Sequence, residues 1–124
     1  MLLRSTLIVN GISTALCGTA LLFAPAALAE LIGVPMPAVL ATVGIGLVLY
    51  AAGLIWTARR RPIPGTAAWA AIVMDLGWVV GSVALVEAGL LTSIGIVLVG
   101  LVAAAVFVFA TLQFVGVRQI ARTV

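Results

Sequence analysis

The chain has 124 residues, of which 65% are hydrophobic and only 7% are charged, and its mean hydropathy is +1.43. A soluble globular domain carries about 25% charged residues, so this chain lacks the polar side chains that would cover its surface in water. The net charge of +3 comes from arginines at the chain ends and in one central loop, without a basic helix face. The composition therefore predicts an integral membrane protein, with the lipid bilayer as its partner, and excludes nucleic acid as a partner.

Much catalytic chemistry is excluded as well, because the sequence contains no histidine and a single cysteine, Cys17. Histidine-based catalytic sets, bis-histidine haem ligation and thiolate metal clusters all need residues that this sequence does not supply. Neither a phosphate-binding loop nor a dinucleotide-binding glycine motif occurs. We therefore expect no enzyme activity, no cofactor and no metal.

Four apolar runs follow one another along the chain, at about residues 2–28, 38–58, 66–86 and 93–117. Each is long enough to cross the hydrocarbon core as a helix. Short connections that contain proline or glycine separate them, as is typical of turns. The sequence predicts one all-α domain over residues 1–124, in which four transmembrane helices form an antiparallel bundle.

The arginines predict the orientation of this bundle. With four crossings, every basic residue falls on one side of the membrane, whereas Glu30 and Glu87 fall on the other; the basic residues are Arg4, Arg59, Arg60, Arg61, Arg118 and Arg122. The positive-inside rule then places both termini in the cytoplasm, in a multi-pass protein of the inner, cytoplasmic membrane.

A signal peptide is an alternative interpretation of the first run, because Ala27-Leu28-Ala29 resembles a cleavage site. The polar residues Asn10, Ser13 and Thr14 interrupt the apolar stretch that a signal peptide would need. We expect the first helix to be retained.

Asp75 is the strongest candidate for a functional residue. It lies nine residues into the third run, which puts it near the bilayer midplane at 1.5 Å per residue. An aspartate at that depth costs about 2.5–3.5 kcal/mol on insertion. Acids in such places face a bundle interior and mark proton relays, transport sites or counter-ions. The alternative is an uncharged aspartate that only joins helices through hydrogen bonds.

Polar residues at a similar depth occur on the other predicted helices. Asn10 and Thr14 share a face of the first helix, Tyr50 lies in the second and Gln113 in the fourth. We expect them to form a hydrogen-bonded cluster around Asp75, with Trp78 bordering any cavity. Helix–helix hydrogen bonding for Asn10 and Gln113, and core filling for Trp78, are the alternative roles.

Glycines at short spacings suggest faces for close helix packing. Gly77 and Gly81 are four residues apart on the third helix, and Gly46 and Gly53 are seven apart on the second. Gly11 and Gly18 on the first helix and Gly100 and Ala104 on the fourth have the same two kinds of spacing. Such spacings let helix backbones approach each other. We expect these faces to pack inside the bundle, in a homo-oligomer, or against a partner protein in the membrane.

Three segments resemble those of uncharacterised small bacterial integral membrane proteins with four helices: Asn10-Gly11, the turn Leu31-Ile32-Gly33-Val34-Pro35, and Asp75-Leu76-Gly77-Trp78-Val79-Val80-Gly81-Ser82. The resemblance covers nearly the whole chain and implies the four-helix fold without an activity. In size the chain is also similar to DoxX-like proteins and to small multidrug-resistance transporters. The latter carry a glutamate inside their first helix, whereas Glu30 lies at the outer end here.

Three functions remain open on the sequence. The first is binding or transport of a small solute, coupled to protons at Asp75. The second is a structural or accessory role, in which glycine-rich helix faces hold a partner protein. The third is binding of a lipid or a quinone in a pocket lined by Trp78 and Tyr50.

Overall fold

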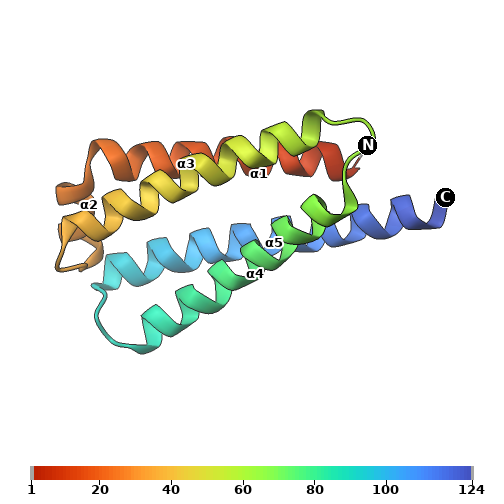
Figure 1. Ribbon diagram of the computed structural model, residues 1–124. Helices are drawn as coiled ribbons and strands as arrows, with labels where there is room; N and C mark the ends of the chain where they lie inside the picture. Colours follow the sequence, from red (N-terminus) through yellow and green to blue (C-terminus); the bar gives the residue numbers. More distant parts are fainter. Residues whose placement is uncertain (1, 124) are drawn as a thin grey trace.

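The computed structural model describes residues 2–123, which form five helices (Figure 1). Their bounds are α1 Leu2–Phe23, α2 Pro25–Ile32, α3 Pro37–Arg59, α4 Gly65–Glu87 and α5 Ser93–Thr123. Four of them, α1, α3, α4 and α5, are long and apolar enough to cross a membrane. The predicted all-α bundle of four spans is confirmed. The side chain of Arg122, one of the six predicted basic markers, lies outside the described residues.

The first predicted run, residues 2–28, is divided into two helices. Pro25 has no amide hydrogen to continue the hydrogen-bond ladder of α1, and its fixed φ suits the first position of a new helix. Accordingly α1 ends at Phe23, and α2 begins at Pro25. At the other end of the chain, α5 extends beyond the predicted limit of residue 117 to Thr123.

The end of α2 is fastened to the beginning of α5. Gly33 ends α2 with a left-handed φ of 105°, which glycine adopts without strain. The amide of Thr92 then donates to the carbonyl of Ile32 at 2.9 Å. The hydroxyl of Thr92 accepts from the amide of Gly95 at 2.9 Å and so caps α5. This α2–α5 clamp joins the two halves of the chain.

The long helices form two pairs, α1 with α3 and α4 with α5 (Figure 1). α1 also packs against α5, whereas α3 and α4 scarcely touch. The pairs lie close together near the two chain termini and diverge toward α2. The bundle is therefore open between α3 and α4, and we call this opening the α3–α4 seam.

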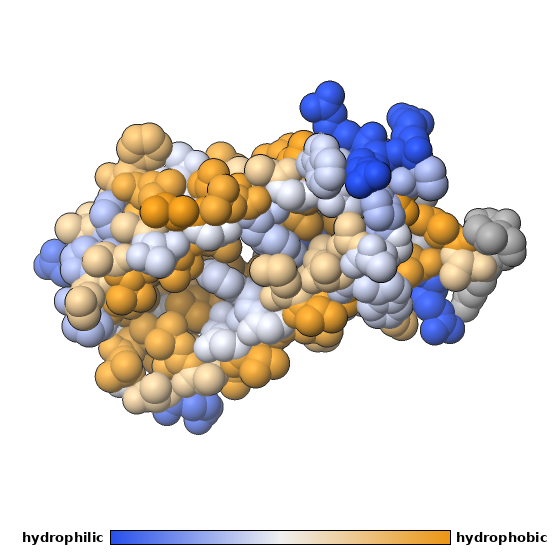
Figure 2. All heavy atoms as spheres, in the orientation of Figure 1, coloured by the Kyte–Doolittle hydropathy of each residue, from blue (hydrophilic) through white to orange (hydrophobic). Residues whose placement is uncertain are grey.

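The surface has charged residues at its two ends and apolar residues between them, which is the arrangement expected of a protein that spans a membrane (Figure 2). Strongly hydrophilic residues gather at the two ends of the molecule, and apolar residues cover most of the surface between them (Figure 2). We call the end with Arg4 and the α3–α4 loop the arginine end, and the end with Glu30 and Glu87 the acidic end. The exposed ring of Trp56 lies 5.0 Å below the guanidinium of Arg60, at the depth of an aromatic belt.

Apolar side chains seal the arginine end. Six buried residues from three helices form this core: Leu3, Leu7, Leu54, Ala58, Ala68 and Ala71. Arg4 adds a polar fastening, because its Nε donates to the carbonyl of Ala58 at 2.7 Å, near the end of α3. Carbonyls at a helix end have no partner within their own helix, so this bond satisfies one of them. The apolar core packs α4 against α1 and α3, and so joins the two helix pairs at this end.

Two facing glycines set the spacing of α1 and α3. A Cβ at Gly44 would lie 2.9 Å from the carbonyl oxygen of Gly18, and a Cβ at Gly18 would lie 2.9 Å from the carbonyl oxygen of Gly44. Real Cβ atoms do not approach a backbone oxygen that closely. Both positions therefore require glycine for the pair to pack as it does.

We predict that Gly44→Ala lowers the free energy of unfolding by about 1–3 kcal/mol, the usual cost of overpacking. Gly100→Ala is the matched control, since a Cβ at that position in α5 meets nothing within 4 Å. Thermal unfolding of the purified protein in detergent measures both variants. Equal stability of the two would contradict the assigned packing of α1 on α3.

Candidate functional site

Asp75 lies on the buried face of α4, with only 3% of its surface exposed. Ala68, Ala71, Ile72 and Ser82 share that face, at the spacing of successive helix turns. The small alanines one and two turns before Asp75 belong to the sealed core. The carboxyl group is therefore held between the helix pairs, just beyond the core of the arginine end.

Three side chains from the three other long helices hydrogen-bond the Asp75 carboxyl group. Its Oδ2 accepts from Nδ2 of Asn10 at 2.8 Å and from Nε2 of Gln113 at 3.0 Å. Its Oδ1 lies 2.9 Å from the hydroxyl oxygen of Tyr50. α1, α3 and α5 thus all meet α4 at one carboxyl group.

The partners of Asp75 are connected to one another as well. Asn10 donates its second amide hydrogen to Oε1 of Gln113 at 2.9 Å, and its own Oδ1 accepts from the hydroxyl of Thr14 at 3.1 Å. Asn10 is 1% exposed and Gln113 is 0% exposed. We call Asp75, Asn10, Thr14, Tyr50 and Gln113 the Asp75 network. Five of the six candidate binding residues are therefore brought together.

Trp78, the sixth candidate, lies one helix turn beyond Asp75 and does not join the network. Its Nε1 atom is buried and has no hydrogen-bond partner among the described residues. Buried indole N–H groups normally find an acceptor. This donor is the one polar side-chain atom found in that state in the described part of the chain.

The contacts of the Tyr50 hydroxyl group are compatible with a proton on Asp75. Tyr50 has one hydroxyl hydrogen, yet its oxygen lies 3.1 Å from the carbonyl oxygen of Ala71 and 2.9 Å from Oδ1 of Asp75. With a proton on Oδ1, Asp75 would donate to Tyr50, and the Tyr50 hydroxyl would then donate to Ala71 alone; without that proton, the Tyr50 hydroxyl donates to Oδ1. The side chains that bond Asp75 are all uncharged, and a buried charge without a counter-charge is costly. A neutral carboxylic acid fits these contacts.

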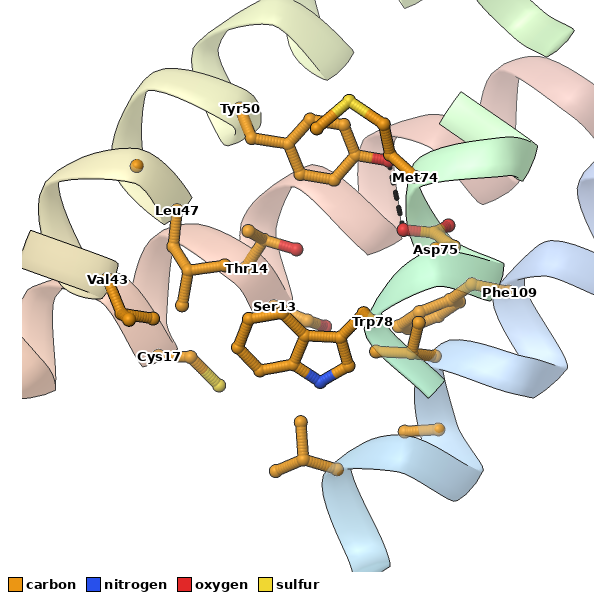
Figure 3. A pocket seen from close by; sticks show the side chains of 14 residues that line it. Ser13, Thr14, Cys17, Val43, Leu47, Tyr50, Met74, Asp75, Trp78 and Phe109 are labelled. Carbon is orange, nitrogen blue, oxygen red and sulfur yellow. Dashed lines mark hydrogen bonds between the residues drawn. The ribbon is translucent and has the colours of Figure 1, made fainter. Parts of the chain in front are cut away.

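A cavity of about 330 Å³ begins at the Asp75 network (Figure 3). All four long helices line this Asp75 cavity, among them Thr14 of α1, Tyr50 of α3, Asp75 and Trp78 of α4, and Phe109 of α5. Thr14, Tyr50 and Asp75 lie together on one side of the Trp78 ring in Figure 3, and the indole nitrogen is directed away from them. These polar groups therefore form one wall of the cavity, and the rest of its lining is apolar apart from Ser13 and Cys17.

A larger apolar cavity of about 820 Å³ adjoins it toward the acidic end. Cys17, Met74 and Trp78 line both cavities. Residues of α2, including Leu28 and Ile32, form the wall at the acidic end. The surface is hollowed between the helix pairs on the face seen in Figure 2. Together the two cavities follow the α3–α4 seam from the Asp75 network toward the acidic end.

The predicted glycine faces of α3 and α4 are open in this chain. A Cβ at Gly46, Gly53, Gly77 or Gly81 would meet nothing within 4 Å. Gly46 instead lines the Asp75 cavity, and Gly77 and Gly81 line the apolar cavity. The predicted pair Gly11 and Gly18 does pack closely inside the bundle, and so do three glycines that were not predicted, Gly44, Gly95 and Gly116. A role for the predicted faces in an oligomer stays a prediction.

Sequence reasoning did not find the apolar lining residues Met74, Val102 and Phe109. Their spacing does not distinguish them from side chains that face lipid. Thr92, which fastens α2 to α5, was also missed, although a threonine just before an apolar run is a signal for a helix N-cap.

Comparison of the chain with protein-family models, curated proteins and solved structures finds no match. The functional argument therefore depends on the geometry of the Asp75 network and its cavities.

We predict that Asp75→Asn keeps the free energy of unfolding within about 0.6 kcal/mol of the parent, the average for a hydrogen bond between membrane helices. An asparagine reproduces the neutral acid, since its oxygen accepts from Asn10 and Gln113 and its amide donates to Tyr50. Asp75→Leu removes the acceptor of one N–H of Asn10 and one N–H of Gln113, both buried, and should lose about 1–3 kcal/mol. Detergent unfolding measures both. An asparagine variant as unstable as the leucine variant would contradict a neutral Asp75.

A second measurement tests the proton directly. We predict that infrared spectra at neutral pH contain a carbonyl stretching band of a protonated carboxylic acid, and that this band is absent from Asp75→Asn. Glu30→Gln is the control, because Glu30 is exposed at the acidic end; that variant should retain the band. A parent spectrum without the band would show that Asp75 is ionised.

Proposed function

We propose that this membrane protein binds a small apolar or amphipathic solute in the cavities of the α3–α4 seam, with Asp75 as the protonatable group at the end of the site. The observation that carries the proposal is the continuity of an apolar, lipid-facing seam with a buried carboxyl group. Acids inside membrane spans are rare, and those that occur mark substrate pathways and proton relays. Ligand sites are mostly apolar clefts with a few convergent polar groups.

Access to this site would come from the lipid or from the acidic end. α3 and α4 scarcely touch, so a lipid-soluble molecule can enter laterally. The core around Leu3, Leu7 and Leu54 closes the opposite end. This arrangement supports binding, and proton-coupled transport would require a second state in which that core opens.

For the orientation, we propose that the arginine end faces the cytoplasm and that the protein lies in the inner membrane. The support is that the arginine side chains of the described residues belong to the termini and to the α3–α4 loop, which lie at one end of the bundle (Figure 1).

A structural or accessory role is the second candidate. It is favoured by the full set of hydrogen bonds around Asp75, which joins all four long helices without any ligand. In that case the open faces at Gly77 and Gly81 would serve a homo-oligomer or a partner protein.

Labelling with a lipid-soluble carbodiimide separates the two candidates, because such reagents modify protonated carboxyls that they can reach from an apolar phase. We expect labelling at Asp75, measured by mass spectrometry. Gly46→Leu fills the Asp75 cavity and should reduce labelling at least about tenfold, which corresponds to a 1.4 kcal/mol barrier. Gly100→Leu, outside the cavities, should label like the parent.

Absence of labelling at Asp75 in the parent protein would count against the binding function and favour the structural one. Equal labelling of Gly46→Leu and Gly100→Leu would show that the reagent does not arrive through the cavity. Labelling of Glu30 and Glu87, which lie outside both cavities, gives the background.

The orientation has its own test, in a Cys17→Ser background that leaves no other thiol. We predict that Glu87→Cys reacts with a membrane-impermeant thiol reagent in intact cells, whereas Arg61→Cys reacts only after the cells are opened. Both positions are exposed. The reverse pattern would contradict a cytoplasmic arginine end.

A further inference from the structure

Trp78 is the side chain that the Asp75 network leaves without a hydrogen-bond partner. From this we infer that the cavities take an uncharged, lipid-soluble ligand with a hydrogen-bond-accepting oxygen, and that the indole N–H of Trp78 recognises this oxygen. The inference rests on the proposed function and specifies the ligand class of the same site.

The indole nitrogen is placed where a ligand can use it. Trp78 lines both cavities and so stands at their junction. Its nitrogen points away from Tyr50 and Asp75 in Figure 3, so the Asp75 network does not satisfy it. The nitrogen is covered in the structure, so a ligand would reach it after the ring turns toward the adjoining cavity. An unpaired buried donor costs about 1–3 kcal/mol, which a ligand oxygen would recover.

The charges of the lining exclude the other ligand classes. Among the described residues that line either cavity, none is basic, so an anion finds no counter-charge. Asp75 is the only carboxyl group among them, and its oxygens already bond Asn10, Gln113 and Tyr50. A cation would have to break those bonds. An uncharged molecule is the class that the site accommodates without rearranging its network.

Depth favours a free compound over the ester group of a membrane lipid. Trp78 lies nine residues before Glu87, the last residue of α4, which corresponds to about 14 Å along the helix. Lipid ester groups lie at the edge of the hydrocarbon core, whereas this donor lies well inside it. A ketone or ether of low polarity dissolves at that depth without being attached to a headgroup.

Benzophenone and diphenylmethane test the inference, since they share two aromatic rings and differ by the carbonyl oxygen. Benzophenone also inserts into nearby C–H bonds on illumination, so saturable labelling of cavity residues such as Met74 measures its binding in detergent. Diphenylmethane is measured as a competitor. We expect the parent protein to bind the ketone roughly 3- to 10-fold more tightly than the hydrocarbon, the factor of one neutral hydrogen bond.

Replacement of Trp78 by 3-benzothienylalanine removes the N–H and keeps the ring shape. We expect this variant to bind both compounds equally, at the affinity of the parent for diphenylmethane. Trp69→Phe is the matched control, because Trp69 lies outside both cavities; it should keep the preference for the ketone.

The outcomes distinguish the inference from the proposed function. Saturable labelling of the cavity without preference for the ketone overturns the role of Trp78 and leaves the binding function in place. Labelling that does not saturate, or that falls outside the cavities, overturns both. Added phospholipids give the last comparison. If a diester phospholipid prevents labelling by benzophenone at concentrations at which a dialkyl ether lipid does not, the oxygen that Trp78 recognises belongs to a membrane lipid.

Discussion

The carboxyl group of Asp75 is the point on which the bundle depends. Each of the other three long helices brings one uncharged side chain to it, through Asn10, Tyr50 and Gln113. In lipid the hydrophobic effect does not drive helices together, so polar contacts and close backbone approach must supply the specificity of packing. The network fixes the rotation of all four helices about their axes at once. The apolar residues around it then need only be small where backbones meet, as at Gly18 and Gly44.

The same arrangement explains why the molecule is closed at one end and open at the other. Beyond Asp75 toward the arginine end, leucine and alanine fill the space between the pairs. Toward the acidic end, the α2–α5 clamp holds the pairs at one edge only, through Thr92 and Ile32. At the other edge, between α3 and α4, the described residues form no hydrogen bond on the acidic side of Tyr50, and cavities remain there. The bundle is open at this edge because its interhelical hydrogen bonds lie elsewhere, as at Thr92 and in the Asp75 network.

Much of this could be predicted from the sequence. Apolar run lengths predict the four spans, and a lone buried acid with polar residues at matching depth predicts the cluster around Asp75, because an uncompensated polar group in lipid is too costly to leave unpaired. The two helices at residues 2–32 could not be separated by hydropathy, since Pro25 changes the backbone and not the apolar character of the run. The glycine spacings were a partial guide: Gly11 and Gly18 pack as predicted, whereas Gly46 lines a cavity and Gly44 packs in its place. A spacing rule cannot distinguish neighbours whose environment depends on how the helix is rotated.

Tyr50 has a consequence for motion. Among the described residues, the hydrogen bonds that cross from α3 to α4 both belong to its hydroxyl group, which contacts Ala71 and Asp75. Widening the seam therefore breaks the contacts of one phenol, while the clamp of α2 on α5 and the glycine contact of α1 with α3 can remain as they are. The two helix pairs are thus joined at one edge by the α2–α5 clamp and at the other edge by the hydroxyl group of Tyr50. Beyond the apolar core, admitting a bulkier molecule between α3 and α4 would therefore cost the hydrogen bonds of this one side chain, and it would not require any helix to unwind.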